Sequence, residues 1–215
     1  MNGSGMRGPD LDFWWTLAGD WVEPPNDARS GWSGMLRTFV GDRFYYVKRQ
    51  RNFLCRSLRH PFGWPTAARE WHALLRMRDL GLKVPVPVFF GMRRTPEGIE
   101  AAVVTEELTG FAPLSEQTGL AADARGALAH CIGRYLGTMH RARLQHGCLY
   151  DKHIMVRWVG GSPEIALIDL EKMRRRWSAG AAVRRDLEQL RRRQAVFDER
   201  AWTELLAGHA VTVRT

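Results

Sequence analysis

Two charged side chains stand where a protein that handles phosphate groups would need them. Lys48 closes a β-prone run, Arg43–Lys48, and Glu70 follows on a segment with helical periodicity. A cation at a strand end can hold the phosphates of ATP, and a carboxylate on the next helix can orient that cation as an ion pair. A surface lysine and a solvated glutamate are the plainer alternative, and spacing alone favours this alternative.

A second group of chemically capable residues lies in the last third of the chain. Asp169 ends a β-prone run that begins at Ile165, and the polar loop His146–His153 precedes that run. An acid at a strand end can bind the metal ion that bridges nucleotide phosphates. Capping a helix is the other role open to Asp169.

The segments between these residues alternate between strand and helix patterns. Gly41-Asp42 joins two β-prone runs and predicts a hairpin, whereas the Pro pair at 24–25 predicts a turn. Residues 1–20 indicate an arm that packs through its aromatic residues, Phe13, Trp14 and Trp15. The remaining expected elements are strands at 35–40, 43–48, 84–91, 101–105, 154–158 and 165–168, and helices at 65–81, 121–143 and 183–207.

The order of these elements matches the signature set of kinases. Six motifs then carry a resemblance to the lipopolysaccharide kinase (Kdo/WaaP) family and, within it, to the InaA-like branch. They are Trp21-Val22-Glu23, Gly31-Trp32-Ser33-Gly34, Tyr46-Val47-Lys48-Arg49-Gln50, His60-Pro61-Phe62-Gly63-Trp64-Pro65-Thr66, Arg69-Glu70 and His146-Gly147-Cys148-Leu149-Tyr150-Asp151-Lys152-His153. The resemblance extends from about Trp21 to Leu190, and the motifs are specific in combination.

The resemblance implies an α+β, protein-kinase-like fold of two lobes, compact, with a reduced C-terminal helical lobe. We expect an arm at 1–20, an N-terminal lobe of sheet plus one helix at 21–105, and a C-terminal lobe at 106–215. Only 46 residues follow Asp169. That length is too short for the long activation segment and helical lobe with which protein kinases bind polypeptides, so a large protein substrate is disfavoured.

The resemblance also implies the site residues and the cofactors, which are ATP and Mg²⁺. The catalytic set is Lys48, Glu70, Cys148, Asp151 and Asp169, and the metal ligands are His153 and Asp169. The nucleotide would contact Gly31, Ser33, Gly34 and Lys48 at its phosphates and Glu106 and Leu108 at its adenine, within the hinge 104–108. An ordinary glycine turn is equally compatible with the Gly31–Gly34 segment, because Arg29 occupies the place of the first glycine of the kinase loop.

The loop His146–His153 departs from the kinase pattern at the position of the catalytic base. Cys148 stands where the catalytic aspartate belongs, and a thiol cannot replace a carboxylate as a base of the same pKa. A general base contributes about 10²- to 10⁴-fold in rate, or roughly 3 to 5 kcal/mol, so activity could be reduced without vanishing. Asp151 is the one carboxylate of the loop that could substitute. We expect His140 and His146 to pack the loop, and Asp186 to hold it down.

The amino-acid composition limits the classes of protein and of partner that fit this chain. The 215 residues carry a net charge of +9 and are 45% hydrophobic, which excludes general disorder. Of 32 basic residues only four are Lys, and the basic balance favours anionic partners, although an Arg-rich genome would produce the same excess. Three widely spaced cysteines without a Cys-x-x-Cys pair suggest neither a disulfide framework nor a zinc site. With no signal-like or spanning segment, we expect a cytoplasmic protein, with peripheral contact at an anionic inner membrane as a further option.

Two functions remain after these arguments. The first is transfer of the ATP γ-phosphate to a sugar hydroxyl of the lipopolysaccharide core, an implication of the resemblance. The alternative is a pseudokinase, a nucleotide-binding or scaffold protein with a role in stress, that lost its base at Cys148. The basic segments suit an anionic glycan or lipid surface, and they are Arg174–Arg176, Arg184–Arg185 and Arg191–Arg193. Nucleic acid is disfavoured because no recognition motif occurs.

Overall fold

The computed structural model of the chain describes residues 9–28, 31–57 and 60–214. The chain forms two compact units. Unit 1 comprises Met1–His72 and Val86–Glu107, and unit 2 comprises Ala73–Pro85 and Leu108–Thr215. Helix α2 (Thr66–Asp79) begins in unit 1 and ends in unit 2.

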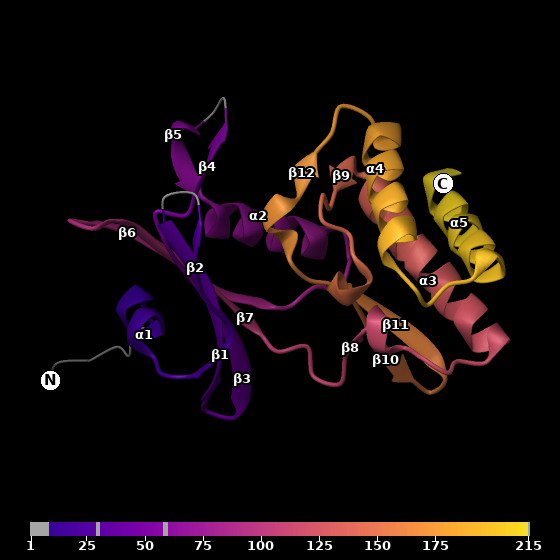
Figure 1. The fold of residues 1–215 in the computed structure, drawn as a ribbon, viewed down its shortest axis with the longest axis horizontal. Helices are drawn as coiled ribbons and strands as arrows, with labels where there is room; N and C mark the ends of the chain where they lie inside the picture. The colour runs from indigo at the N-terminus through magenta and orange to yellow at the C-terminus, as the bar shows by residue number, and fades with distance from the viewer. Residues whose placement is uncertain (1–8, 29–30, 58–59, 215) are drawn as a thin grey trace, which may run out of the picture. The chain divides into compact units, whose positions relative to one another are not determined.

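Unit 1 is built on a five-stranded antiparallel sheet with the order β1-β2-β3-β7-β6 (Figure 1). The strands are β1 (Asp20–Ala28), β2 (Gly31–Val40), β3 (Arg43–Arg51), β6 (Pro87–Thr95) and β7 (Gly98–Glu106). A short ribbon, β4 (Leu54–Ser57) with β5 (His60–Pro65), precedes α2. The predicted hairpin is present as β2 and β3, and Gly41 adopts a φ of 66° in its turn, a conformation that favours glycine.

The N-terminal arm contributes one residue to the core of unit 1. Helix α1 (Leu11–Thr16) begins after Asp10, whose side chain accepts a hydrogen bond from the backbone N–H of Phe13 at 3.0 Å. Trp14 is buried among Leu36, Val47 and Val104. The prediction that the arm packs through its aromatic residues therefore holds most fully for Trp14, because Phe13 is 37% exposed.

The predicted turn at 23–26 is wrong. Pro24 and Pro25 lie inside β1, and the pairing of β1 with β2 shifts register between Trp21 and Glu23 and again between Glu23 and Asn26. Proline cannot donate to a ladder, so it is tolerated in strands at edges and at bulges. Because β1 is an edge strand of the sheet, the irregular pairing around its prolines affects only its ladder with β2.

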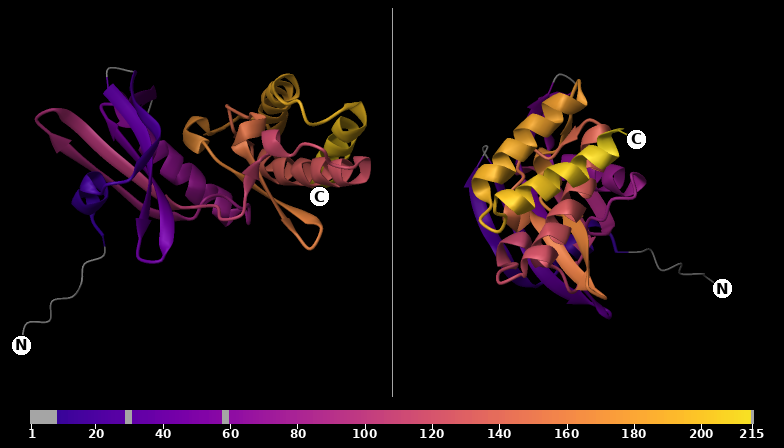
Figure 2. Two further views of the ribbon diagram at one scale, coloured as in Figure 1. Left: turned by 60° about the horizontal axis from the view of Figure 1, so that its bottom comes forward. Right: turned by 90° about the vertical axis from the view of Figure 1, so that its right-hand side faces the viewer.

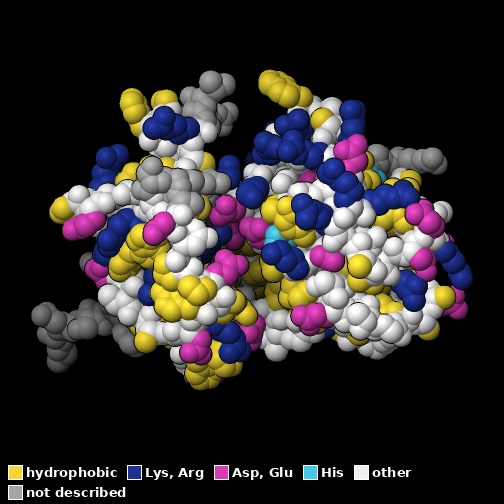
Figure 3. All heavy atoms as spheres, viewed as in Figure 1, with side chains coloured by type: hydrophobic (Ala, Val, Ile, Leu, Met, Phe, Trp, Pro, Cys, Tyr) yellow, Lys and Arg dark blue, Asp and Glu magenta, His cyan; other side chains and the backbone are white. Residues whose placement is uncertain are grey.

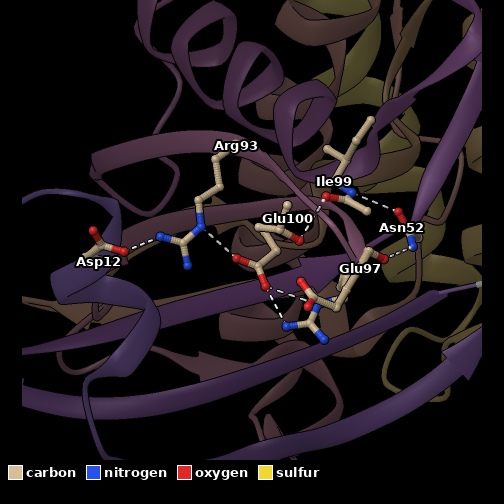
Figure 4. Close-up of polar contacts among 9 residues, drawn as sticks. Asp12, Asn52, Arg93, Glu97, Ile99 and Glu100 are labelled. Atoms are coloured by element: carbon tan, nitrogen blue, oxygen red, sulfur yellow. Dashed lines mark hydrogen bonds and ion pairs between the residues drawn. The ribbon is translucent and has the colours of Figure 1, made fainter.

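A network of ion pairs ties the arm to the sheet (Figure 4). Glu100, which is 2% exposed, accepts hydrogen bonds from Arg51 at 2.6 Å and from Arg93 at 2.7 Å. Arg93 also pairs with Asp12 of α1. Two bound guanidinium groups compensate the desolvation of the Glu100 carboxylate, and the network joins α1, β3, β6 and β7.

Unit 2 combines three long helices with a small sheet (Figure 2). The helices are α3 (Ala122–Arg141), α4 (Ala179–Arg193) and α5 (Glu199–Arg214), and the three-stranded sheet is β8 (Ala112–Pro113), β10 (Ile154–Val159) and β11 (Ser162–Leu167). The shorter elements are β9 (Leu144–Gln145) paired with β12 (Arg174–Arg175), and the 3₁₀ turns η1 (Leu114–Glu116), η2 (Asp151–His153) and η3 (Leu170–Lys172). Leu128, Ile132, Leu136 and Met139 are fully buried on α3, as their spacing predicts. Among the described residues, no helix has both the length and the apolar character needed to cross a membrane.

The helix predicted over 183–207 is wrong in its extent, because two helices occupy that region. Ser178 caps α4 by accepting a hydrogen bond from the N–H of Ala181 at 3.2 Å. After α4, the side chain of Gln194 accepts from the backbone N–H of Phe197 at 2.6 Å, and Asp198 caps α5. These side-chain hydrogen bonds and the burial of Phe197 replace the backbone hydrogen bonds of a continuous helix. The segment 194–198 holds no Gly or Pro, so the sequence pattern does not indicate the break.

Helices α3 and α5 lie side by side (Figure 2), and glycines permit their close approach. A Cβ at Gly133 would lie 2.0 Å from the backbone oxygen of Leu205, where only a backbone shift could make room. We predict that Gly133→Ala lowers the free energy of unfolding by at least about 2 kcal/mol through overpacking. Gly126→Ala is the matched control, because its Cβ would meet only Glu204 Cγ at 3.7 Å. Urea denaturation should show the control to be as stable as the parent or more so, and equal stability of both variants would contradict this packing.

Candidate functional site

Lys48 and Glu70 form a shielded ion pair within unit 1. Lys48 lies on β3 opposite Met35 of β2 and Val103 of β7. Its Nζ lies 2.8 Å from Oε2 of Glu70 on α2, and each side chain is 10% exposed. The sequence predicted Lys48 at the end of its strand, but β3 continues to Arg51, because the polar residues after Lys48 pair with the neighbouring strands.

Gln50 explains how the helix is placed against the strand. Its Nε2 donates to Thr66 Oγ1 at 2.8 Å, and its Oε1 accepts from the backbone N–H of Ala67 at 2.8 Å. Gln50 is fully buried, so these bonds fix the start of α2 on β3. Glu70 follows Thr66 by four residues, one helical turn on, and this brings its carboxylate beside Lys48. Sequence reasoning missed Gln50, although it lies two residues after Lys48 in a motif already singled out.

The glycine segment lies within strand β2. A Cβ at Gly31 would lie 2.1 Å from the backbone oxygen of Arg51, and one at Gly34 would lie 2.8 Å from the Trp21 ring. Ser33 Oγ accepts a hydrogen bond from Gln50 Nε2 at 3.2 Å. Packing within unit 1 therefore accounts for both glycines. The position compared with the first kinase glycine, 29, lies outside the described residues.

The two expected adenine contacts stand on either side of the unit boundary. Glu106 is the last residue of β7, where its backbone N–H donates to the Val86 oxygen at 2.9 Å and its carboxylate accepts from Arg43 at 2.8 Å. Leu108 begins the following segment, and its oxygen accepts from the N–H of Phe111 at 3.2 Å. The Glu106 side chain is thus committed to an ion pair.

In unit 2, Asp186 of α4 fastens the start of the loop. Its carboxylate is fully buried and accepts hydrogen bonds from the backbone N–H groups of His146 at 2.7 Å and Gly147 at 3.0 Å. Gly147 has a φ of 80°, which favours glycine. The contact predicted between Asp186 and the loop is therefore present.

The two histidines expected to pack the loop do so in different ways. His146 is buried, with Nε2 3.0 Å from the oxygen of Ile168, and burial lowers the pKa of His146. His140 instead lies in α3, where its ring nitrogens lie 3.2 Å from Asp186 Oδ2 and 2.9 Å from His209 Nε2. His140 therefore contacts the residue that holds the loop, and it belongs to a buried chain of groups that reaches α5.

This buried chain of side chains, Asp186, His140 and His209, predicts that the folded protein loses stability at acidic pH. Burial, followed by the charge of His140, lowers the pKa of His209 to about 4, against about 6.5 in an unfolded chain. Between these values the unfolded chain binds a proton that the folded one does not, so the free energy of unfolding falls as the pH drops from 6.5 toward 4. His209→Gln should flatten this part of the stability curve, measured by thermal unfolding across pH, whereas the control His130→Gln, at a half-buried site outside this chain of groups, should not. Parallel curves for all three proteins would contradict the assignment.

Cys148, His153 and Asp169 gather in unit 2 with one donor atom each, all within 4.8 Å of one another. His153 Nε2 lies 3.5 Å from Asp169 Oδ2, and His153 Nδ1 lies 2.7 Å from the backbone oxygen of Cys148. The sequence predicts Asp169 at the end of its strand, but β11 ends at Leu167, so Asp169 lies two residues beyond the strand, in a left-handed conformation with φ 58°. Its side chain makes no capping bond to η3, which removes the helix-cap alternative.

The environment of Cys148 keeps its sulfur protonated. Burial, reinforced by the negative charge of Asp169, raises the pKa of the thiol above its usual range, and Lys172 opposes this effect from 3.9 Å. A neutral thiol cannot accept the proton of a substrate hydroxyl. Asp151 lies three residues later at the start of η2, where its Oδ1 accepts a hydrogen bond from the N–H of Lys152 at 2.8 Å.

The donor set can be compared with the ligands that Mg²⁺ requires. Mg²⁺ takes oxygen ligands in octahedral geometry, and of this cluster only Asp169 supplies one. Imidazole and thiol groups suit softer ions. The cluster as a whole therefore does not fit Mg²⁺, and the expected magnesium role of His153 has no support in its surroundings.

Comparison with known proteins agrees with the order of elements and motifs. The profile of the lipopolysaccharide kinase (Kdo/WaaP) family matches residues 12–209. Protein InaA of Escherichia coli (strain K12) is 32% identical over 204 residues, 92% of this chain and 94% of that protein. Lipopolysaccharide core heptose(I) kinase WaaP of Pseudomonas aeruginosa is 28% identical over 145 residues, 56% of this chain and 50% of that kinase.

A solved structure, WaaP in complex with acyl carrier protein, matches with a TM-score of 0.72 and 23% identity, over 93% of this chain and 81% of that one. This likeness shows the expected α+β, protein-kinase-like fold. The family match supports a kinase-like function related to lipopolysaccharide. The chain therefore belongs to the lipopolysaccharide kinase (Kdo/WaaP) family, in its InaA-like branch.

Proposed function

We propose that the chain binds ATP and transfers its γ-phosphate to a sugar hydroxyl of the lipopolysaccharide core. The observation that carries this proposal is the shielded ion pair between Lys48 and Glu70 at 2.8 Å. A lysine on this strand paired with a glutamate on the next helix is the arrangement with which kinases hold the α- and β-phosphates. The relative WaaP is a kinase of a core sugar, heptose(I), by its name.

In this proposal the residues of unit 1 bind and orient the nucleotide. The Lys48 ammonium neutralises phosphate oxygens, and Glu70 holds the long lysine side chain in one position, so less entropy is lost on binding. Backbone groups of Glu106 and Leu108 receive the adenine, which leaves the ion pair of Glu106 undisturbed. The family resemblance also implies that the Gly31–Gly34 segment, with Ser33, lies near the phosphates, but packing within unit 1 already accounts for its two glycines.

In unit 2 the loop supplies the proton acceptor, and Asp169 adds a negative charge near it. Cys148 is buried as a neutral thiol, so we propose that Asp151 accepts the proton of the sugar hydroxyl. Phosphoryl transfer depends mainly on positioning and electrostatics. A displaced base would therefore slow the reaction without abolishing it.

The Asp151→Asn variant tests this role. We predict at least a 100-fold loss of phosphate transfer, the lower end of a general base's contribution, with unchanged ATP binding because the Lys48–Glu70 pair is untouched. Mass spectrometry of the oligosaccharide measures the transfer. Asp123→Asn, on the exposed first turn of α3, is the control. Unchanged turnover in the Asp151 variant would remove the proposed base.

A second candidate function is nucleotide binding without phosphate transfer, as in a pseudokinase. The burial and raised pKa of Cys148, at the place of the usual base, favour it. Incubating the purified protein with ATP and core oligosaccharide distinguishes the two. A phosphorylated sugar supports the kinase function, and ATP binding without a phosphorylated product supports the pseudokinase function. If the protein neither binds ATP nor forms the product, both functions are contradicted.

Contact with an anionic glycan or lipid surface is a further part of the proposal. Trp177 is 97% exposed and follows the exposed Arg174 and Arg175, and Arg184 and Arg185 are exposed on α4. Figure 3 shows Lys and Arg side chains interspersed with acidic ones over the face in view. An exposed indole beside arginines suits the interface of an anionic bilayer. Sedimentation with phosphatidylglycerol vesicles, and not with phosphatidylcholine vesicles, is the expected result.

A further inference from the structure

The group formed by Cys148, His153 and Asp169 has a chemistry of its own. We propose that these three side chains form a binding site for a borderline d-block cation, Zn²⁺, in preference to Mg²⁺. The three residues lie in the loop and directly after β11, all within unit 2. The cluster shares Asp169 with the proposed phosphate transfer, but ion binding requires no nucleotide and is tested without it.

The spacing of the donors is close to that of a bound zinc ion. Two ligands about 2.0 to 2.1 Å from a tetrahedral Zn²⁺ lie about 3.3 Å from each other. His153 Nε2 and Asp169 Oδ2 lie 3.5 Å apart, and the sulfur of Cys148 completes a triangle with sides of no more than 4.8 Å. Small side-chain rotations would bring all three onto one ion.

The hydrogen bonding of His153 prepares it as a ligand. Its Nδ1 lies 2.7 Å from the backbone oxygen of Cys148, which can only accept, so Nδ1 carries the proton. When Nε2 carries no proton, its lone pair and the Asp169 carboxylate are two acceptors 3.5 Å apart that one metal cation can bridge. Histidines that bind metals regularly donate their other N–H to a carbonyl oxygen in this way.

The donor types select the ion. A thiolate, an imidazole and a carboxylate are the ligands that zinc takes, whereas Mg²⁺ prefers oxygen alone. Binding would displace the thiol proton of Cys148 to solvent and form the Zn–S bond. Cys148 and His153 are 6% and 8% exposed, while the Asp169 side chain is 32% exposed. Three protein ligands with one accessible side leave a fourth position for water or for an oxyanion.

The ammonium group of Lys172 lies near the cluster sulfur and acts against the entry of a metal ion. Its Nζ lies 3.9 Å from Cys148 Sγ. Lys172 is an exposed residue, so its ammonium can move into solvent when an ion enters. Lys172→Met should therefore keep the site and bind the ion at least as tightly as the parent.

The test uses the untagged full chain without nucleotide. Titration with Co²⁺ should give one ion per chain and a thiolate-to-cobalt charge-transfer absorption, and Zn²⁺ should displace the cobalt while a thousandfold excess of Mg²⁺ should not. Cys148→Ser should abolish the absorption. His153→Ala and Asp169→Asn should each weaken Zn²⁺ binding at least tenfold, as measured by competition with a chelating dye.

Matched controls lie in the same unit. Cys131→Ser and His130→Ala should bind the ion as the parent does, because neither residue belongs to the cluster. Thermal unfolding without metal verifies that each variant is folded. Failure to bind Zn²⁺ in the micromolar range, binding that survives Cys148→Ser, or displacement by Mg²⁺ would each overturn the proposal. ATP binding is measured separately, so its failure would leave this result interpretable.

Discussion

The Lys48→Met protein should show no rise in melting temperature when ATP is added. Ligand at 100 times its dissociation constant stabilises a protein by about 2.7 kcal/mol, which corresponds to a rise of about 5 to 10 °C for a chain of this size. We expect that rise in the parent and its loss in the variant, because methionine fills the space of Lys48 without the charge that pairs with phosphate. Differential scanning fluorimetry with and without ATP measures both.

Removing Lys48 also removes one ion-pair partner of the buried Glu70 carboxylate. Loss of one member of a buried pair costs about 3 to 5 kcal/mol, so the variant should melt lower even without ATP. The double variant Lys48→Met/Glu70→Gln removes both charges and should recover much of this stability but none of the ATP response. Lys83→Met is the control, since Lys83 pairs with Glu164 and its side chain is 43% exposed. An ATP response in the double variant equal to that of the parent would contradict the role of Lys48.

Asp186→Ala should be the most destabilising single substitution in unit 2. The carboxylate accepts two backbone hydrogen bonds, from His146 and Gly147, and lies 3.2 Å from His140 Nε2, all without solvent exposure of Asp186. Each buried group left unsatisfied costs about 1 to 3 kcal/mol, so we expect a loss of about 3 to 5 kcal/mol in the free energy of unfolding. Urea denaturation measures this loss.

Two further variants control for this substitution. Asp186→Asn keeps one acceptor oxygen and should lie between the parent and the alanine variant. Asp123→Ala removes a carboxylate that is 97% exposed in the same unit, and it should leave stability unchanged. A parent-like denaturation midpoint for Asp186→Ala would show that the loop is held by other contacts.

The sequence predicted those parts of the fold that depend on local patterns. The β2–β3 hairpin follows from two β-prone runs on either side of Gly41, and the buried face of α3 follows from its three- to four-residue spacing of apolar side chains. The link between Asp186 and the loop came from the family resemblance. Lys48 and Glu70 were assigned as a pair for the same reason, and their ion pair is present in unit 1.

Other features depend on contacts that no local pattern encodes. Pro24 and Pro25 indicate a turn unless β1 is known to be an edge strand. The break between α4 and α5 arises from side-chain bonds of Gln194 and Asp198 in a stretch that holds no Gly or Pro. Gln50 anchors α2 only because strand and helix meet in three dimensions.

The proposed zinc site likewise depends on contacts that the number and spacing of cysteines do not encode. Without a Cys-x-x-Cys pair, the sequence predicted no zinc site. Cys148 and His153 lie five positions apart in one loop, whereas Asp169 is distant in sequence, and the turn after β11 brings its carboxylate within 4.8 Å of the other two donors. A rule based on paired cysteines does not detect a cluster of one cysteine, one histidine and one aspartate assembled by tertiary structure.

The central claim is that this chain binds ATP through the ion-paired lysine of unit 1. Isothermal titration calorimetry with ATP on the parent and on Lys48→Met/Glu70→Gln tests it most directly. We predict one ATP per chain for the parent and at least 100-fold weaker binding for the double variant. Equal dissociation constants for the two proteins, or no binding by the parent at millimolar ATP, would contradict the claim.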